Sequence, residues 1–136
     1  MSPDADPAED GAIRLVLPSD AEFVAVARFV AGFIATQADF TLEEVEDLRL
    51  AVDELFTSGG GLDNSHSSAL WTFRHHRQES DLLITMAAQP SGKRDSESPH
   101  YELSQQLLAA LVDDHGEGAD DNGGRYLWLR KSRRSG

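Results

Sequence analysis

The 136-residue chain contains no cysteine, so disulfides, thiolate catalysis and thiolate-bound metals are excluded. Its apolar runs fall well short of the roughly 20 residues that a membrane-spanning helix needs, so no membrane association is expected. The acidic N-terminus, MSPDADPAED, lacks the apolar segment of a signal peptide, and the expected location is therefore the cytoplasm. A chain of this length is expected to form one domain with a substantial core.

Basic residues are also scarce, because 24 Asp and Glu stand against 12 Lys and Arg, a formal net charge of −12. Four of the basic residues lie in the last seven positions, at Arg130, Lys131, Arg133 and Arg134. Direct nucleic-acid binding is not expected, because phosphates require a positive surface. A basic protein partner fits this charge, and so does a plain role in solubility.

Hydrophobic spacing divides the chain into a disordered acidic tail at 1–11, one folded domain at 12–131 and a basic tail at 132–136. The acidic, glycine-rich stretch 113–124 is interpreted as a connection. The predicted elements are, in order, a strand over 12–17, helices over 20–37 and 41–58, strands over 69–75 and 82–87, a helix over 101–112 and a strand over 126–131. This order predicts a two-layer α+β domain with the helices on one face of the sheet.

The first predicted helix is apolar nearly all round. Its core stripe is predicted to consist of Phe23, Val26, Val30, Phe33 and Ile34. Val24 and Phe29 lie off that stripe, and Arg28 is the only charged residue between Phe23 and Gln37. Such a helix is buried on more than one side, either by its own domain or by a partner. Val24, Arg28 and Phe29 are therefore candidate partner contacts.

The second predicted helix begins where Thr41 and Glu44 match the capping-box pattern. Asp53 and Glu54 lie late in this helix, where the dipole disfavours negative charge, and such exceptions to local rules often mark function. The inner stripes are predicted to be Val45, Leu48, Val52, Leu55 and Phe56 in the second helix and Leu103, Leu107, Leu108 and Leu111 in the third.

Motifs for metal or nucleophilic chemistry are few. His75 and His76 are neighbours on one predicted strand and so point to opposite faces, and the other histidines lie in or beside loops; all five are interpreted as solvated. The stretch DDHGEGADDNGG lacks the ligand spacing of a calcium loop. No phosphate loop of the GxxxxGK[ST] type is present, and no metal site or hydrolase triad is predicted.

The segment from Asp47 to Ser58, DLRLAVDELFTS, carries the most informative pattern. It resembles the N-box helix of anti-sigma factors in the RsbW/SpoIIAB serine-kinase family, in which that helix reads approximately LAV-x-E-x-x-x-N. Leu50-Ala51-Val52 and Glu54 fit this pattern. Later, LLAALVDDH resembles the closing helix and acidic pair of the family, and the resemblance spans about residues 12–131.

The resemblance implies the GHKL, or histidine-kinase-like, ATPase fold: a two-layer sandwich of a mostly antiparallel four-stranded sheet with three helices on one face. It also implies that Glu54 occupies the position of the general base. Ser58 stands where the family has a magnesium-holding Asn, and Gly92 lies in AAQPSGK where the family has its DxGxG adenine box. Glu102 and Ser104 replace glycines that let backbone N–H groups approach phosphate.

All three nucleotide boxes thus depart from the family pattern, and no cofactor is expected. The resemblance then implies an anti-sigma factor in stress-response transcription regulation, one that sequesters an alternative RNA polymerase sigma factor. An anti-anti-sigma protein with a STAS domain would release it by partner switching, and a homodimer is implied as well. The alternative is an active serine kinase that uses Mg-ATP to phosphorylate that antagonist. A third possibility is an acidic interaction domain with this fold and another partner.

Overall fold

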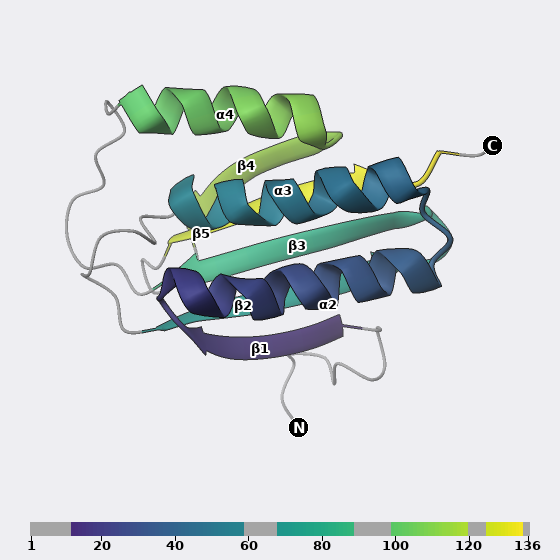
Figure 1. Cartoon of the computed structure of the whole chain (residues 1–136), viewed down its shortest axis with the longest axis horizontal. Coiled ribbons are helices and arrows are strands. Elements are labelled where there is room, and N and C mark those ends of the chain that lie inside the picture. The colour runs from purple at the N-terminus through teal and green to yellow at the C-terminus, as the bar shows by residue number, and fades with distance from the viewer. Residues whose placement is uncertain (1–11, 59–67, 89–98, 120–124, 135–136) are drawn as a thin grey trace.

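The computed structural model describes residues 12–58, 68–88, 99–119 and 125–134. Its elements, in chain order, are β1 (Ala12–Pro18), the single-turn 3₁₀ helix η1 (Ala21–Phe23), α2 (Val24–Gln37), α3 (Leu42–Ser58), β2 (Ser68–His76), β3 (Asp81–Ala88), α4 (Pro99–Leu111), β4 (Asp114–Ala119) and β5 (Arg125–Ser132). The three α-helices lie on one face of an antiparallel sheet whose strand order is β1-β2-β3-β5-β4 (Figure 1). The α+β class and the single helical layer are confirmed.

The sheet has five strands, so the prediction of four was wrong. The additional strand is β4, which lies in the stretch interpreted as a connection and pairs with β5 at the sheet edge. Strand propensity did not predict β4, because β4 contains two glycines and glycine is depleted in strands. Each glycine lies opposite an aromatic residue of β5: Gly116 opposite Trp128, and Gly118 opposite Tyr126.

Those aromatic rings explain why β4 has glycine at positions 116 and 118. A Cβ at Gly118 would lie 2.5 Å from the Tyr126 hydroxyl oxygen, and one at Gly116 would lie 3.0 Å from Trp128. The rings therefore cover the bare backbone of β4, an arrangement that stabilises glycine in edge strands. Tyr126 and Trp128 are half-buried as a result, and part of their apolar surface is already used within the chain.

The core forms between α3 and the inner face of the sheet. The predicted α3 stripe is confirmed, since Val45, Leu48, Val52, Leu55 and Phe56 are all buried. The sheet contributes Trp71 and Phe73 from β2, Leu82, Ile84 and Met86 from β3, and Leu127 and Leu129 from β5. In the described ranges, no helix is both long and apolar enough to cross a membrane.

The core stripe predicted for α2 was right only in part: Val30 and Ile34 pack against the core, but Phe23, Val26 and Phe33 are exposed. The buried residues of α2 are Val24 and the alanines at positions 27, 31 and 35, whereas Phe29 and Phe33 are 69% and 55% exposed. Alanines four residues apart share one helix face, and their small side chains let α2 pack closely on its neighbours. The large residues, which a size-based prediction puts inside, are left pointing outward. Val24 is therefore not available as a partner contact.

The inward face of α4 was predicted only in part. Leu108 is buried and Leu111 packs against the core, but Leu103 and Leu107 are exposed. Ser104 takes the inward position instead and is 3% exposed. This small polar residue faces α3, where it finds a hydrogen-bond partner.

Candidate functional site

The N-terminus of α3 is held by the predicted capping box. The Thr41 N–H donates to Glu44 Oε1 at 2.7 Å, and the Glu44 N–H donates to Thr41 Oγ1 at 3.1 Å. The second carboxylate oxygen of Glu44 accepts the Arg134 N–H at 2.8 Å, which ties the C-terminal segment to α3. Burial raises the pKa of Glu44, but these hydrogen bonds and the charge of Lys131 outweigh it and hold the pKa below its usual value.

The two late acids of α3 have partners on opposite sides of the helix. Asp53 forms an ion pair with Arg28 of α2, whose Nη1 donates to Asp53 Oδ1 at 2.5 Å. Glu54 Oε1 accepts a hydrogen bond from the hydroxyl of Ser104 on α4 at 2.9 Å. The exceptions to local helix rules therefore tie α3 to both neighbouring helices, and Arg28 is already engaged inside the chain.

A second tie between α3 and α4 was missed by the sequence analysis. Lys131 on β5 is only 7% exposed, and its Nζ donates to the Leu111 carbonyl at the end of α4 at 2.7 Å. The same Nζ lies 3.5 Å from Asp47 Oδ2. Asp47 and Glu54 are seven residues apart and so lie on one side of α3, a spacing that could have indicated their shared role.

Of the predicted nucleotide-site residues, the structure brings together Glu54, Ser104 and Ser58. Ser58 ends α3, is 8% exposed, and its hydroxyl has no hydrogen-bond partner among the described residues. It lines a cavity of about 40 Å³ together with Gln105 of α4 and His115 of β4. Glu102 is exposed on the first turn of α4, and Gly92 lies outside the described residues.

The cavity beside Ser58 is small compared with Mg-ATP. Pockets for ligands of that size enclose roughly 300–1,000 Å³, whereas the described cavity holds about 40 Å³, enough for little more than water. The Glu54 carboxylate, which would act as the base, is bound by Ser104. The described residues show no ATP-sized cavity beside Ser58, and we derive no chemical step through Mg-ATP. No group of three potential metal-ligating side chains occurs among them either.

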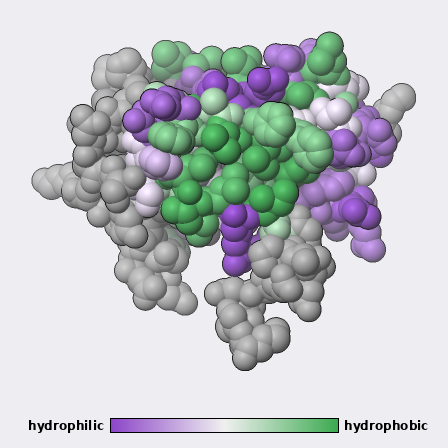
Figure 2. All heavy atoms as spheres, turned by 60° about the horizontal axis from the view of Figure 1, so that its bottom comes forward, coloured by the Kyte–Doolittle hydropathy of each residue, from purple (hydrophilic) through white to green (hydrophobic). Residues whose placement is uncertain are grey.

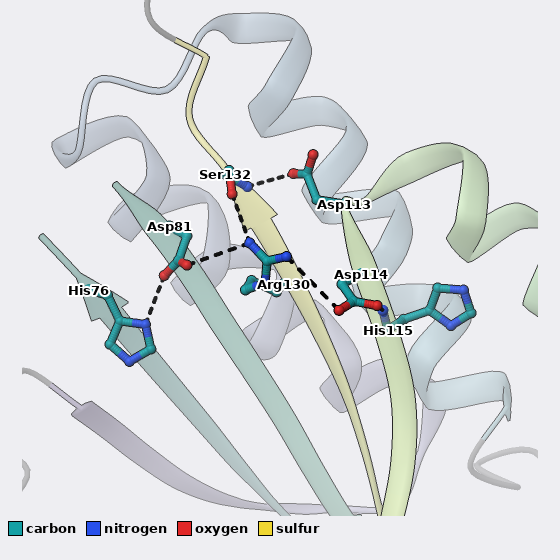
Figure 3. Close-up of polar contacts among 7 residues, drawn as sticks. All are labelled: His76, Asp81, Asp113, Asp114, His115, Arg130 and Ser132. Carbon is teal, nitrogen blue, oxygen red and sulfur yellow. Dashed lines mark hydrogen bonds and ion pairs between the residues drawn. The ribbon is translucent and has the colours of Figure 1, made fainter. Parts of the chain in front are cut away.

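A polar cluster lies at the end of the sheet near the β2–β3 turn (Figure 3). His76 Nδ1 lies 2.8 Å from Asp81 Oδ1, so His76 is paired rather than simply solvated, which corrects the prediction for this residue. Arg130 extends toward Asp81 and Asp114, with N···O distances of 3.7 and 3.9 Å. These pairs link neighbouring strands, and we assign them a structural role.

The exposed surface of α2 carries two large aromatic side chains. The rings of Phe29 and Phe33 stack on each other with centroids 6.3 Å apart. Figure 2 shows a continuous hydrophobic surface on the side of the molecule formed by α2 and β1. Its exposed large members are Ile13, Val16, Phe23, Val26, Phe29 and Phe33. Contiguous apolar surface of this kind marks sites of protein–protein contact.

The architecture, with three helices on one face of an antiparallel sheet, broadly fits the histidine-kinase-like ATPase fold. No family model matches the chain. The sequence is 24% identical over 111 residues to the serine-protein kinase RsbW of Bacillus pumilus (strain SAFR-032), a similarity that covers 78% of this chain and 67% of that protein. This similarity supports a relationship to RsbW.

Proposed function

We propose that the chain is an anti-sigma factor that sequesters an alternative RNA polymerase sigma factor and is released by a STAS-domain antagonist. The similarity to RsbW supports this class of regulator. The observation that carries the proposal is the exposed Phe29–Phe33 pair on a domain of strongly acidic composition. A basic sigma surface would be attracted by the acidic body, and apolar contacts on α2 would hold it.

The proposed contact is centred on Phe29. Arg28 borders it, although its guanidinium pairs with Asp53 of α3. A pull-down or biolayer interferometry with recombinant alternative sigma factors tests the proposal, comparing the wild type with Phe29→Asp. Leu50→Asp on α3 is a matched control, because Leu50 is also an exposed apolar helix residue. Loss of binding in Phe29→Asp with normal circular dichroism, and retention in Leu50→Asp, are the expected results. Unchanged affinity in Phe29→Asp would eliminate this site.

Binding of sigma is proposed to proceed without efficient ATP binding. The support is the small cavity beside Ser58 and the hydrogen bond that engages Glu54. The alternative, a serine kinase acting on the antagonist, is favoured by the presence of Glu54 at the family base position and by the similarity to a protein named as a kinase. Such a kinase would need Mg-ATP.

We also propose a homodimer. Like-charged copies repel each other, so self-association is expected at a neutral surface, and α2 offers apolar residues whose one charge, Arg28, is paired. Tyr126 and Trp128 are weaker candidates, because they cover Gly118 and Gly116. Light scattering should give twice the 14.9 kDa chain mass. A monomer mass at high concentration would contradict the dimer and leave the whole α2 surface to the sigma factor.

A further inference from the structure

A second recess lies where the C-terminal end of α2 meets β1 and the β2–β3 turn. It encloses about 450 Å³, which is within the range of sites that bind ligands, although it is open to solvent on one side. It is distinct from the small cavity beside Ser58, with which it shares no lining residue. Of the exposed apolar residues named above, only Ile13 and Phe33 line it.

The two sides of this groove differ in chemistry. One side is apolar and is formed by Ile13 of β1 with Phe33, Ile34 and Ala38 at the end of α2. The other side is polar and includes His75, Arg77 and Arg133. Because Phe33 lines the groove and also stacks on Phe29, the groove continues the apolar surface of α2.

The groove is positively charged, which contrasts with the net charge of −12 on the whole chain. It contains two arginines and one acid, Asp39. Neither Arg77 nor Arg133 has an ion-pair partner among the described residues. Burial lowers the pKa of His75, and the charges of Arg77, His76 and Arg133 lower it further, while Asp81 opposes them. Two guanidiniums with no ion-pair partner among the described residues therefore lie in one recess with an imidazole whose pKa they lower.

Ordered turns hold these groups in place. The Ser80 N–H donates to the Arg77 carbonyl at 3.2 Å, and the Arg133 N–H donates to the Ser80 carbonyl at 2.8 Å. These bonds fix the backbone of both arginines to one turn. On the other side, the Phe40 N–H donates to the Ala35 carbonyl at 3.0 Å and closes the end of α2. The backbone of the groove is therefore ordered, which reduces the conformational entropy that is lost when a ligand binds.

We propose that this groove binds a segment of a partner protein in which a carboxylate side chain lies next to an apolar side chain. The apolar side chain packs on Ile13, Phe33 and Ile34, and the carboxylate accepts hydrogen bonds from Arg77 and Arg133. A protein segment fits better than a free small molecule, because the groove is open and continues onto the α2 surface rather than enclosing a ligand. This site goes beyond the proposed function and does not require that the partner be a sigma factor.

The test is an NMR titration of the full chain with the dipeptide N-acetyl-Phe-Glu-amide. The matched probes are N-acetyl-Phe-Gln-amide, which lacks the charge, and N-acetyl-Ser-Glu-amide, which lacks the apolar group. The Phe-Glu peptide should shift the resonances of Ile13, Phe33 and His75 and bind about tenfold more tightly than either matched probe, as expected for a lost charge-assisted hydrogen bond or a lost apolar contact. The pKa of His75 should rise on binding the Phe-Glu peptide but not the Phe-Gln peptide, since a nearby carboxylate favours the imidazolium.

Variants test whether Arg77 and Arg133 bind the carboxylate of the peptide. The double variant Arg77→Gln/Arg133→Gln should bind the Phe-Glu peptide no better than the Phe-Gln peptide, while apolar contacts persist. Arg134→Gln is the matched control, because Arg134 is an exposed neighbour that does not line the groove. Both arginines of the double variant are exposed, so circular dichroism should show a normal fold.

Three results would overturn the proposal. The first is the absence of shifts in the groove at millimolar peptide, and the second is equal affinity for the Glu and Gln peptides. The third is tighter binding of octanoate than of the Phe-Glu peptide, which would make the groove a site for small amphipathic anions. None of these measurements involves a sigma factor, so their outcome is separate from that of the proposed function.

Discussion

The hydroxyl of Ser104 on α4 donates a hydrogen bond to Glu54 Oε1 on α3 at 2.9 Å, across 50 residues of chain. At the far end of the same helix pair, Lys131 joins the Leu111 carbonyl to Asp47. Two acids on one side of α3 thus tie it to α4: Glu54 directly at the middle of α4, and Asp47 through Lys131 at its C-terminal end. The carboxylate that the family resemblance assigns to catalysis is part of this structural tie.

The Glu54 tie predicts how substitutions change stability. Glu54→Gln should change the unfolding free energy by less than about 0.5 kcal/mol, because the amide oxygen still accepts the Ser104 hydroxyl. Glu54→Ala and Ser104→Ala should each lose about 1 kcal/mol, and the double variant should lose less than the sum. Urea unfolding of the wild type and the four variants measures these differences. Additive losses in the double variant would show that the two residues do not interact.

Nucleotide binding should be weak. The described cavity of about 40 Å³ and the engaged Glu54 lead us to expect no heat of Mg-ATP binding at tens of micromolar by titration calorimetry. Glu54→Gln should then leave sigma affinity and promoter repression unchanged. A low-micromolar dissociation constant, or antagonist phosphorylation that Glu54→Gln abolishes, would replace our proposal with the kinase alternative.

Binding to a sigma factor should depend on salt mainly through its association rate. The acidic body speeds encounter with a basic surface, whereas contacts on α2 govern dissociation. Raising sodium chloride from about 0.05 to about 0.5 M should therefore slow association markedly and change dissociation less. Surface plasmon resonance separates the two rates. A dissociation rate that rises with salt as strongly as association falls would point to a charged rather than an apolar contact.

The capping residue Glu44 should make stability depend on acid pH. Its pKa is lower in the folded chain than the ordinary value of 4.5, so its contribution is complete above that value and disappears as pH falls through the folded pKa. The difference in unfolding free energy between the wild type and Glu44→Gln should thus be largest at neutral pH and shrink below about pH 4.5. Thermal or urea unfolding across this range gives the difference. A constant difference would mean that Glu44 titrates alike in both states.

Replacing Gly32 and Gly118 by alanine should change the stability of the protein in opposite directions. A Cβ at Gly32 would lie 3.4 Å from Arg49 Cδ, a flexible side chain, so Gly32→Ala should stabilise α2 by up to about 1 kcal/mol. A Cβ at Gly118 would collide with the Tyr126 hydroxyl, so Gly118→Ala should destabilise the protein by at least about 1 kcal/mol. Thermal unfolding distinguishes them. The double variant Gly118→Ala/Tyr126→Ala is the control, and the two losses should be less than additive, because the ring whose Cζ lies 2.6 Å from the new Cβ is removed.

Local patterns in the sequence were sufficient for the helices and four of the strands. The α3 stripe and the Thr41–Glu44 capping box were both predicted and are both present. Each depends on residues within one or a few helical turns, where spacing alone places side chains on a common face. The sequence also singled out Asp53 and Glu54, because they conflict with the helix dipole.

The residues that Asp53 and Glu54 contact could not be predicted from the sequence. Asp53 meets Arg28 from 25 residues away, and Glu54 meets Ser104 from 50 residues away. Strand β4 likewise depends on Trp128 and Tyr126 covering its glycines from the neighbouring strand. The outward position of Phe29 and Phe33 follows from close packing of the α2 alanines. Periodicity along a chain determines which residues share a face, but only the packing of one element against another determines which face is buried and what each side chain contacts.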